Sequence, residues 1–514
     1  MLAKLLLLCA LAGPLLAQSN PCPTGSRFGD PSASPAWNGW GVDASNARFQ
    51  PAKTAQLPAD QITKLKLKWA FGFPGVRSVL GQPSVVGGRV FIGVDTGAIY
   101  SLDAATGCLY WTYQAEAGVR TAITVERSGP ARYAAFFGDL KANAYAVDAT
   151  TGELLWKSHV DPHPLARITG APKVAEGRVY IPVASGEEGA AMRKYECCSF
   201  RGSVVALDAA SGRQIWKTYT IAAEPKPAGK NSDGLQRWAP AGAGVWNSPT
   251  IDLKRRALYV GTGDAFTEPA ASTSDAIMAF DLDTGKILWS KQDTENDVWL
   301  VGCTAKTNPE NCPKNLGPDH DFGASPILKT LSDGRTILVA GQKSGNVWAH
   351  DVDRQGAVVW KTALVGNTTE FGGKIVWGGS ADEQNAYFGL GPGGIAAVQL
   401  RDGERKWFTP LEPAPALAQH PGQEGPLAAI SGAIFSGGWD GVLRALSAAN
   451  GKVIWEYNTV QEFKTVNGVE AKGGSIGAAG PTVAGGTLFV PSGYIGVRNG
   501  MPGNVLLAFA MPKE

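Results

Sequence analysis

The phrase LDAATGCLYW, residues 102–111, decides the fold because it returns along the chain with the same chemistry. An apolar residue and an Asp lead into a Gly-containing turn, and a short strand-like run then ends in Trp. The other copies are VDATTGELLW (147–156), LDAASGRQIW (207–216), FDLDTGKILW (280–289), HDVDRQGAVVW (350–360), QLRDGERKW (399–407) and LSAANGKVIW (446–455). The Asp-x-x-Ser/Thr-Gly pattern is typical of a tight turn between antiparallel strands.

Each repeat contains about four short β-runs, too few to bury both of its own faces, so neighbouring units must stack. Four-stranded units repeated at this period indicate a β-propeller. An eighth Trp strand, LKLKWAF (65–71), precedes the first unit, and an incomplete unit without a Trp strand (481–510) follows the last. The sequence therefore predicts an all-β, eight-bladed propeller over residues 36–514, with its ring closed by the N-terminal strand.

Composition agrees with this fold and excludes some functions. Of 514 residues, 65 are Gly and 16 are Trp, a turn-rich and aromatic content. A Trp at one fixed place in every repeat indicates packing between blades rather than chemistry. The net charge is only +2, without a basic stripe, so no nucleic-acid partner is expected.

The first residues form a targeting segment. Lys4 precedes an apolar run over residues 5–12, and small residues follow up to Ala17. This pattern predicts a secretory signal peptide over residues 1–17, followed by an N-terminal tail over 18–35. The apolar run is too short to span a bilayer, and no later stretch is apolar for 18 residues. We therefore expect no membrane span, and a soluble protein that is periplasmic or secreted.

Export changes the interpretation of the cysteines, because an even number of them in an oxidising compartment favours disulfides. Six remain after the signal peptide. Cys303 and Cys312 flank a Pro/Asn-rich loop and are expected to close it. Adjacent Cys197 and Cys198 either form two ordinary bridges to other cysteines or a vicinal disulfide with each other. No Cys-x-x-Cys-His is present, so the chain is expected to carry no c-type haem.

Insertions between the repeats mark where function is expected. The spacing between successive Trp strands grows from 42 residues (Trp69 to Trp111) to 73 (Trp216 to Trp289). In a propeller such insertions form loops on one face. Five unusual clusters fall in loops or at strand ends: SGEE (185–188), GAGVW (242–246), VGTGD (260–264), TENDVW (294–299) and GQKSG (341–345).

Three acids in successive insertions, Glu188, Asp264 and Asp297, suit a hard cation such as calcium if their carboxylates converge. One carboxylate near such an ion can instead stay free to accept a proton. Arg120 and Lys343 can bind an anionic ligand, and Trp246 offers a flat surface.

The Trp repeats and these clusters resemble the pyrroloquinoline quinone (PQQ)-dependent alcohol dehydrogenases, eight-bladed propellers of the periplasm. WNGWGVDASNARFQP (37–51), IDLKRRALYVGTGD (251–264) and SDAIMAFDLDTGKILWSKQ (274–292) are most similar to the polyvinyl-alcohol dehydrogenase-like branch. The resemblance extends over residues 36–512. It implies PQQ and Ca²⁺ as cofactors.

The resemblance also implies roles for single residues. Asp297 would take the alcohol proton, and Lys343 would stabilise charge at the quinone's reactive carbonyl. The implied calcium ligands are Glu188, Asp264 and Asp297. The implied quinone-binding residues are Arg120, Thr169, Ser185, Gly186, Glu187, Trp246, Lys343 and Trp377.

The expected activity is hydride transfer from a small or polymeric alcohol, including secondary alcohols, to PQQ. Since the chain has no haem motif, the electrons would pass to an external acceptor such as a soluble cytochrome c. Two alternatives stay open at this point: a propeller scaffold that binds proteins without a quinone, and a PQQ enzyme for sugars or aldehydes.

Overall fold

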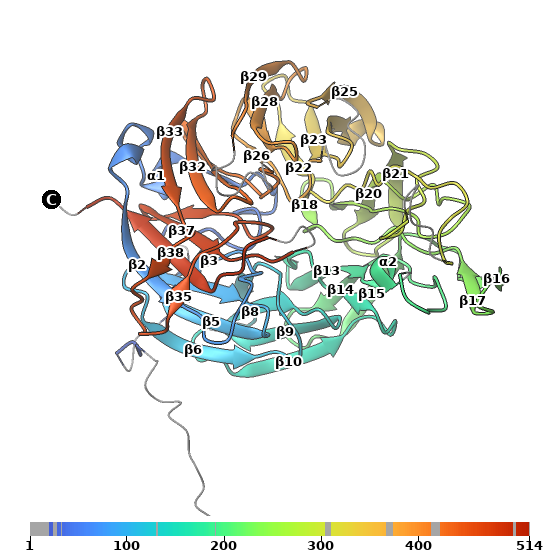
Figure 1. Ribbon diagram of the computed structural model, residues 1–514, viewed down its shortest axis with the longest axis horizontal. Helices are drawn as coiled ribbons and strands as arrows, with labels where there is room; N and C mark the ends of the chain where they lie inside the picture. The colour runs from blue at the N-terminus through green and yellow to red at the C-terminus, as the bar shows by residue number, and fades with distance from the viewer. Residues whose placement is uncertain are drawn as a thin grey trace, which may run out of the picture.

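Eight antiparallel sheets stand around a central axis in the computed structural model (Figure 1). The structure describes residues 20–23, 28–31, 33–129, 132–190, 192–303, 310–365, 374–412, 422–496 and 500–512. The predicted signal peptide lies outside these ranges. Within them, no helix has both the length and the apolar character needed to cross a membrane.

The sheets confirm the predicted eight blades, which we number in chain order. Blade 1 is β3 (Ser84–Val86), β4 (Arg89–Gly93), β5 (Ala98–Asp103) and β6 (Leu109–Gln114); blade 2 is β7 (Thr124–Arg127), β8 (Tyr133–Gly138), β9 (Asn143–Asp148) and β10 (Leu154–His159); blade 3 is β12 (Lys173–Ala175), β13 (Arg178–Ser185), β14 (Ser203–Asp208) and β15 (Gln214–Tyr219), with β11 (Ala166–Arg167) also paired to β13; blade 4 is β18 (Thr250–Asp252), β19 (Ala257–Gly261), β20 (Ala276–Asp281) and β21 (Ile287–Gln292). Blade 5 is β22 (Ile327–Thr330), β23 (Thr336–Gly341), β24 (Asn346–Asp351) and β25 (Ala357–Ala363); blade 6 is β26 (Ser380–Ala381), β27 (Asn385–Gly389), β28 (Ile395–Gln399) and β29 (Arg405–Thr409); blade 7 is β30 (Ala428–Ile430), β31 (Ala433–Gly437), β32 (Val442–Ser447) and β33 (Val453–Asn458), with β1 (Phe49–Gln50) parallel to β30; blade 8 is β36 (Thr482–Ala484), β37 (Thr487–Ser492), β38 (Val505–Ala510) and β2 (Lys66–Gly72).

The remaining elements are short and lie between blades or in insertions. They are the helices α1 (Ala52–Ala55) and α2 (Glu187–Ala190), the 3₁₀ turns η1 (Ala59–Lys64) and η2 (Val352–Arg354), and the hairpins β16 (Lys226–Lys230)–β17 (Gln236–Ala239) and β34 (Glu462–Phe463)–β35 (Ala471–Lys472).

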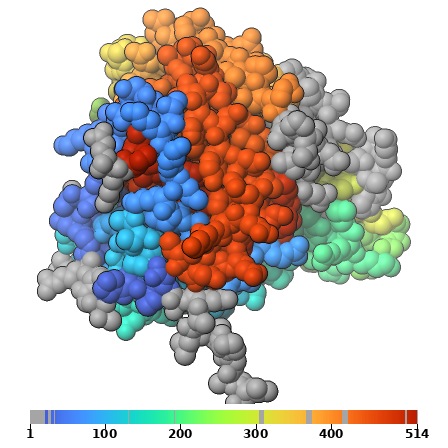
Figure 2. Space-filling model, turned by 60° about the vertical axis from the view of Figure 1, so that its left-hand side comes forward, coloured from blue at the N-terminus to red at the C-terminus, as the bar shows by residue number. Residues whose placement is uncertain are grey.

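Strand exchange closes the ring as predicted. β2 pairs antiparallel with β38, so that Trp69 lies opposite Ala508. The N-terminal segment, blue, therefore lies beside the C-terminal segment, orange-red, on the face in Figure 2. Since β2 is the outermost strand of blade 8, the first part of the chain completes the last blade.

The recurring tryptophans pack each blade onto the next, as expected. The indole Nε1 of Trp156 donates to the carbonyl of Ala209 at 3.0 Å, in the Asp-x-x-Ser-Gly turn of the following blade. A Cβ on Gly212 of that turn would lie 2.6 Å from the Trp156 ring, and Gly212 has φ of +70°. The turn glycine thus provides both the left-handed conformation and the space for the indole.

Residues 37–48 contact the innermost strands of successive blades. An inner strand leaves one row of main-chain groups unpaired, and this segment bonds to main-chain groups of that row in six blades. In blade 3 the contact is the Lys173 ammonium on the Asp43 carbonyl, and in blade 8 it is with Pro481, directly before the inner strand. With distances of 2.5 to 3.0 Å, the hydrogen-bonded pairs from blade 1 to blade 7 are Trp37 with Val85, Asn38 with Val125, Asp43 with Lys173, Ala44 with Ile251, Ser45 with Leu328, Ala47 with Ala381 and Arg48 with Ala429. In blade 8, Arg48 donates to the Pro481 carbonyl at 3.3 Å.

One end of the ring collects the insertions. Because the strands of a blade are antiparallel, its first and third strands begin, and its second and fourth strands end, at the same end of the ring. The connections at that end include 186–202, 262–275 and 293–326, whereas tight turns lie at the other end. This end is where the insertions were expected to place the functional residues.

The described residues contain three disulfides. Cys22–Cys108 fixes the tail against blade 1, and Cys303–Cys312 closes the loop for which it was predicted. Cys197 and Cys198 bond to each other, which decides between the two alternatives left open by the sequence.

Candidate active site

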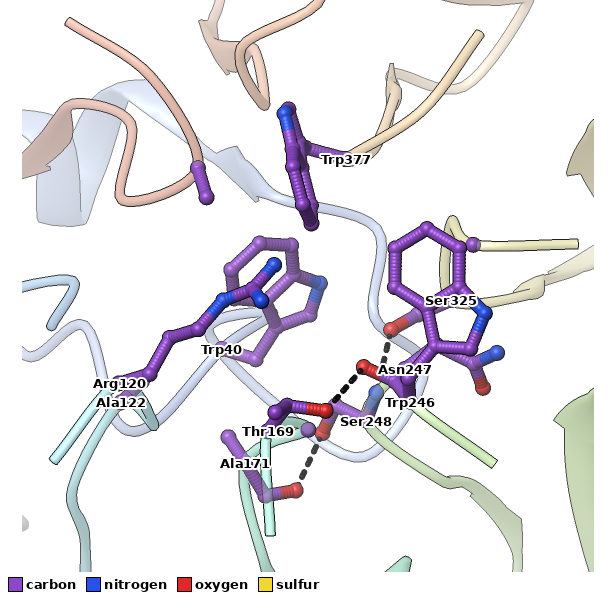
Figure 3. A pocket seen from close by; sticks show the side chains of 13 residues that line it. Trp40, Arg120, Ala122, Thr169, Ala171, Trp246, Asn247, Ser248, Ser325 and Trp377 are labelled. Carbon is purple, nitrogen blue, oxygen red and sulfur yellow. Dashed lines mark hydrogen bonds between the residues drawn. The ribbon is translucent and has the colours of Figure 1, made fainter. Parts of the chain in front are cut away.

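A hollow at the axis gathers four of the predicted cofactor-binding residues, Arg120, Thr169, Trp246 and Trp377. They occupy related places, three or four residues before the first strand of blades 2, 3, 4 and 6. The segment that crosses the inner strands adds Trp40 to the lining. Figure 3 shows the indoles of Trp40, Trp246 and Trp377 around the hollow, with the Arg120 side chain reaching toward Trp40 and Trp377.

Aromatic and cationic contacts fix these side chains. The Arg120 guanidinium carbon lies 4.2 Å from the Trp377 ring centroid, and Trp377 meets Trp246 edge to face at 5.4 Å. Thr169 Oγ1 lies 3.5 Å from the Trp246 carbonyl, one of the dashed contacts in Figure 3. The hollow therefore offers flat aromatic surfaces with a guanidinium at one side.

Arg167 is a second guanidinium in this region, which the sequence did not single out. A Cβ on Gly186 would lie 1.8 Å from an Arg167 terminal nitrogen, so the absence of a side chain at Gly186 gives the guanidinium its place. Burial and the nearby charge of Arg120 lower the Arg167 pKa, while Glu188 opposes that shift. Arg120 and Arg167 together form a positive region suited to carboxylates.

Buried carboxylates form a cluster next to the edge of Trp246. Among the described residues, two groups have oxygens within 4.8 Å of one another: Asp264, Asp319 and Asp321, and Asp264, Asp275 and Asp297. All five side chains are buried. A Cβ on Gly263 would lie 2.8 Å from Asp321 Oδ1 and 3.3 Å from Trp246 Nε1, which places the first group beside the indole.

Lys343 neutralises part of the first group. Its ammonium lies 2.5 Å from Asp319 Oδ1 and 2.6 Å from Asp321 Oδ2, and 5.4 Å from the Trp246 centroid. Lys374 pairs with the other oxygen of Asp319. Although burial alone would raise the Asp319 pKa, the two ammonium groups hold it below its usual value. Burial opposes the charge of Lys343, but Asp319 and Asp321 raise its pKa well above the usual value.

Asp297 lies in the second group, away from Lys343. Its oxygens accept from the main-chain N–H groups of Asp319 at 3.2 Å and His320 at 2.8 Å. The side chain is fully buried, and burial with the charges of Asp321 and Asp319 raises its pKa to about 6. The predicted trio of Glu188, Asp264 and Asp297 is thus brought together only in part: Asp264 and Asp297 share a group, and Glu188 belongs to neither close group of the described residues.

Glu188 still faces the cluster from blade 3. Burial, Asp321 and Asp319 raise its pKa to about 8, while Lys343 and Arg167 act in the opposite direction. The neighbouring Glu187 is turned into the protein. Its carboxylate accepts from the Tyr195 hydroxyl at 3.0 Å and from the main-chain N–H groups of Ser199 and Phe200 at 2.8 to 3.1 Å.

Ser185 accepts from the Glu187 N–H at 2.8 Å. Ser185 and the Glu187 carboxylate therefore hold the loop that presents Glu188. Their direct contact with a cofactor stays a prediction.

The sequence analysis missed Trp40, Arg167, Asp275, Asp319, Asp321 and Lys374. One signal was available for two of them. DHDFGASP (319–326) directly precedes the first strand of blade 5, the same place that Arg120, Thr169 and Trp246 take in their blades. Arg167 and Asp275 carry no comparable signal, because only the tertiary structure shows what faces them.

The cluster has the properties of a cation site. Neither carboxylate oxygen of Asp264 or Asp275 has a hydrogen-bond partner among the described residues, and both groups are buried. Burial and neighbouring carboxylates raise both pKa values well above the usual range. Leaving such acceptors unpaired is costly, and several carboxylate oxygens within a few ångströms are the ligands that calcium prefers. The residues present therefore fit the predicted ion.

Two family profiles match the chain. The beta-propeller domain of glucose, ethanol and alcohol dehydrogenases, a PQQ family, matches residues 37–307. The profile of the outer membrane protein assembly factor BamB matches residues 200–420 and 391–509.

Sequence relatives and a solved structure indicate the same family as the first profile. The chain is 43% identical to a polyvinylalcohol dehydrogenase of Pseudomonas sp. and 39% identical to one of Sphingopyxis sp., in each case over 94% of this chain, and over 78% and 77% of those proteins. Among solved structures, a quinohemoprotein alcohol dehydrogenase from Pseudomonas putida HK5 superposes with a TM-score of 0.69 at 18% identity, over 94% of this chain and 80% of that one.

Proposed function

This chain belongs to the PQQ-dependent glucose, ethanol and alcohol dehydrogenases, and from this premise we propose that it oxidises secondary hydroxyl groups of a polymeric alcohol. Membership of this family makes the chain an oxidoreductase of the PQQ-dependent alcohol dehydrogenase type. One observation carries the proposal: an aromatic hollow lined by Arg120 adjoins a buried carboxylate cluster that is paired with Lys343 and Lys374, and a second guanidinium, Arg167, lies near Arg120 and Glu188. The polymeric substrate is supported by the two polyvinylalcohol dehydrogenase relatives.

The residues of the hollow are matched to a planar, tricarboxylated quinone. Trp246 offers a ring face for stacking, Trp377 and Trp40 limit the space around it, and Arg120 and Arg167 supply positive charge for carboxylates. PQQ, when bound, supplies an electrophilic carbon that accepts the hydride of an alcohol. Ser185 and Gly186, with Glu187 behind them, complete this wall of the site in the proposal.

The cofactor's cation, calcium in this proposal, would be held by Asp264, Asp321 and Glu188. The charges of these residues act on Lys343, whose ammonium lies 5.4 Å from the Trp246 ring centroid, whereas Asp297 belongs to the second group. The Lys343 ammonium is placed to stabilise negative charge that develops on a quinone oxygen. It acts inside a buried site, where charge stabilisation is stronger than in water.

Asp319 is the better placed of the two candidate bases. A general base must reach the proton that it removes. Asp297 has both oxygens held by main-chain N–H groups and no exposed surface, whereas Asp319 is 7% exposed and bonds Lys343 and Lys374. We therefore assign the alcohol proton to Asp319 and keep the sequence-based assignment to Asp297 as the alternative.

Location and electron acceptor complete the proposal. The predicted signal peptide and the three disulfides support the periplasm or secretion, since disulfides persist in oxidising compartments. A soluble cytochrome c is the proposed acceptor, because the sequence has no c-type haem motif.

The proposal is tested with purified protein loaded with PQQ and Ca²⁺. We expect a quinone absorbance band and reduction of an artificial electron-acceptor dye by polyvinyl alcohol and by short secondary diols, with a higher kcat/KM for the polymer. Faster dye reduction by glucose or by aldehydes would contradict the substrate assignment while leaving the quinone site intact. Failure to bind PQQ would contradict the site itself.

A further inference from the structure

We propose that blade 4 holds a second cation, a Ca²⁺ ion bound by Asp275 and Asp297 and bridged through Asp264 to the cofactor's cation. The bridging part of this inference rests on the proposed function, because it needs the first ion. The second site itself is built from residues of blade 4 and the loops that follow β19 and β21.

The three side chains come from positions that the sheet brings to one point. Asp264 follows the end of β19, Asp275 directly precedes β20, and Asp297 lies beyond β21. In antiparallel neighbours these positions meet at one end of the blade. One oxygen from each carboxylate lies within 4.8 Å of the others, about the span of two Ca–O bonds of roughly 2.4 Å.

Hydrogen bonds within the protein do not account for the close approach of the three carboxylates. Asp264 is 2% exposed and Asp275 is fully buried, and none of their four oxygens has a hydrogen bond of normal geometry among the described residues. The side chains of Ser274 and Asp264 lie beside the Asp275 carboxyl and oppose the rise of its pKa, which burial dominates. Asp297 accepts two main-chain N–H groups and keeps further lone pairs. Buried acceptors in native proteins are almost always satisfied, and a hard cation satisfies all three carboxylates at once.

Charge balance favours two ions over one. The six carboxylates of the cluster are Glu188, Asp264, Asp275, Asp297, Asp319 and Asp321. Lys343 and Lys374 are the two ammonium groups paired with it among the described residues. Arg167 acts on Glu188 as a third positive charge. If all six acids are ionised, three negative charges remain, and one divalent ion would still leave one. A second divalent ion offsets this remaining charge, and its place is the group that no lysine contacts.

The competing explanation is a proton shared between Asp264 and Asp275, with only one ion bound. Both explanations satisfy the orphaned oxygens, but they differ in stoichiometry. A proton-sharing pair predicts one Ca²⁺ per chain, and it predicts that the isosteric change Asp275→Asn leaves calcium binding unchanged.

The experiment measures calcium stoichiometry and affinity by calorimetry and elemental analysis, on protein stripped with a chelator and refilled with CaCl₂, with and without PQQ. We expect two ions per wild-type chain. Asp275→Asn should bind one ion, while Asp321→Asn should lose the other. The matched control is Glu295→Gln, which changes an exposed carboxylate two residues from Asp297 and should keep two ions.

A second readout separates loss of the site from loss of the fold. Removing a repelling carboxylate should raise the melting temperature of metal-free Asp275→Asn above that of the metal-free wild type, and should reduce the stabilisation by calcium. One ion per wild-type chain, or two ions in Asp275→Asn with unchanged affinity, would overturn the inference. PQQ absorbance is recorded in parallel, so failure of the quinone site is distinguished from failure of the second ion site.

Discussion

Single side chains in the active site differ in ways that their sequence neighbourhood does not reveal. Asp297 and Asp319 are both buried acids in the same insertion, yet one is held by main-chain N–H groups and the other by two lysines. Only the second partnership can change when a substrate proton arrives, because an ammonium group can reorient and a main-chain amide cannot. The chemistry therefore depends on which partners each acid has.

Asp319→Asn should lower kcat by at least about 100-fold, the usual contribution of a general base, with PQQ absorbance retained. Asp297→Asn should keep measurable turnover, since Asp297 accepts hydrogen bonds from the main chain of the 319–320 loop, and in our proposal it binds a cation rather than the substrate proton. Stopped-flow reduction of the bound quinone by alcohol measures both variants. Full activity in Asp319→Asn together with none in Asp297→Asn would restore the sequence-based assignment.

The pKa of Lys173, on the inner strand of blade 3, likewise depends on the groups around it. Its buried ammonium donates to the Asp43 carbonyl at 2.5 Å, and burial lowers its pKa to about 8, with Asp43 raising it and Arg48 lowering it further. A folded-state pKa below the unfolded value means that the unfolded chain binds more protons between pH 8 and about pH 10. The free energy of unfolding of the wild type therefore increases as the pH rises through this range.

Lys173→Met removes the titrating group, so the stability difference between variant and wild type should depend on pH. The advantage of the variant at pH 7 should shrink by roughly 3 kcal/mol as the pH rises to 10. Urea unfolding at several pH values measures the difference, with the exposed Lys53→Met as control. A pH-independent difference would contradict the burial argument.

At the scale of elements, the Trp strand and the Asp-x-x-Ser/Thr-Gly turn form one packing unit across two blades. The indole hydrogen bond and the Gly contact recur between blades, for example from Trp156 to Ala209 and from Trp360 to Leu400. This unit explains why the repeat can be recognised in the sequence. Local geometry determines the residue types that join two blades, and each blade junction needs the same residue types.

Gly212→Ala should destabilise the protein by about 2–4 kcal/mol, because the new methyl group meets the Trp156 ring and the residue has a positive φ. Gly177→Ala is the matched control: φ is +75° there, but a Cβ would meet nothing within 4 Å. The control should lose only about 1 kcal/mol. Equal losses in denaturant unfolding would show that backbone strain alone, and not the indole contact, sets the cost.

At the scale of the whole molecule, ring closure makes every blade depend on two neighbours. The pairing of β2 with β38 and the contacts of residues 37–48 with all eight blades leave no terminal repeat that could unfold alone. In an open array of repeats, by contrast, the ends unfold first because they have one neighbour.

Phe71→Ala in β2 and Phe280→Ala in β20 each remove a buried ring, 2% and 0% exposed, from opposite parts of the ring. Each should cost about 3–5 kcal/mol. Both should shift one common transition, seen alike by far-UV circular dichroism and Trp fluorescence. Two separate transitions, or a loss confined to one probe, would contradict a ring that unfolds as a unit.

The sequence by itself determined the eight blades, the closing strand and the end of the ring that carries the insertions. It could do so because hairpin turns and the Trp–Gly contact are local interactions that repeat. It also indicated Arg120, Thr169, Trp246 and Trp377, which lie three or four residues before the first strand of their blades.

The tertiary structure alone decided which acids meet, which lysines pair with them, that Trp40 lines the hollow and that Arg167 lies near Arg120 and Glu188. These contacts join blades that are far apart in the chain, and a carboxylate in a loop has the same local signature whether it faces solvent, an amide or another carboxylate. Only the closed ring determines its neighbours, and burial among those neighbours sets its charge and its chemistry.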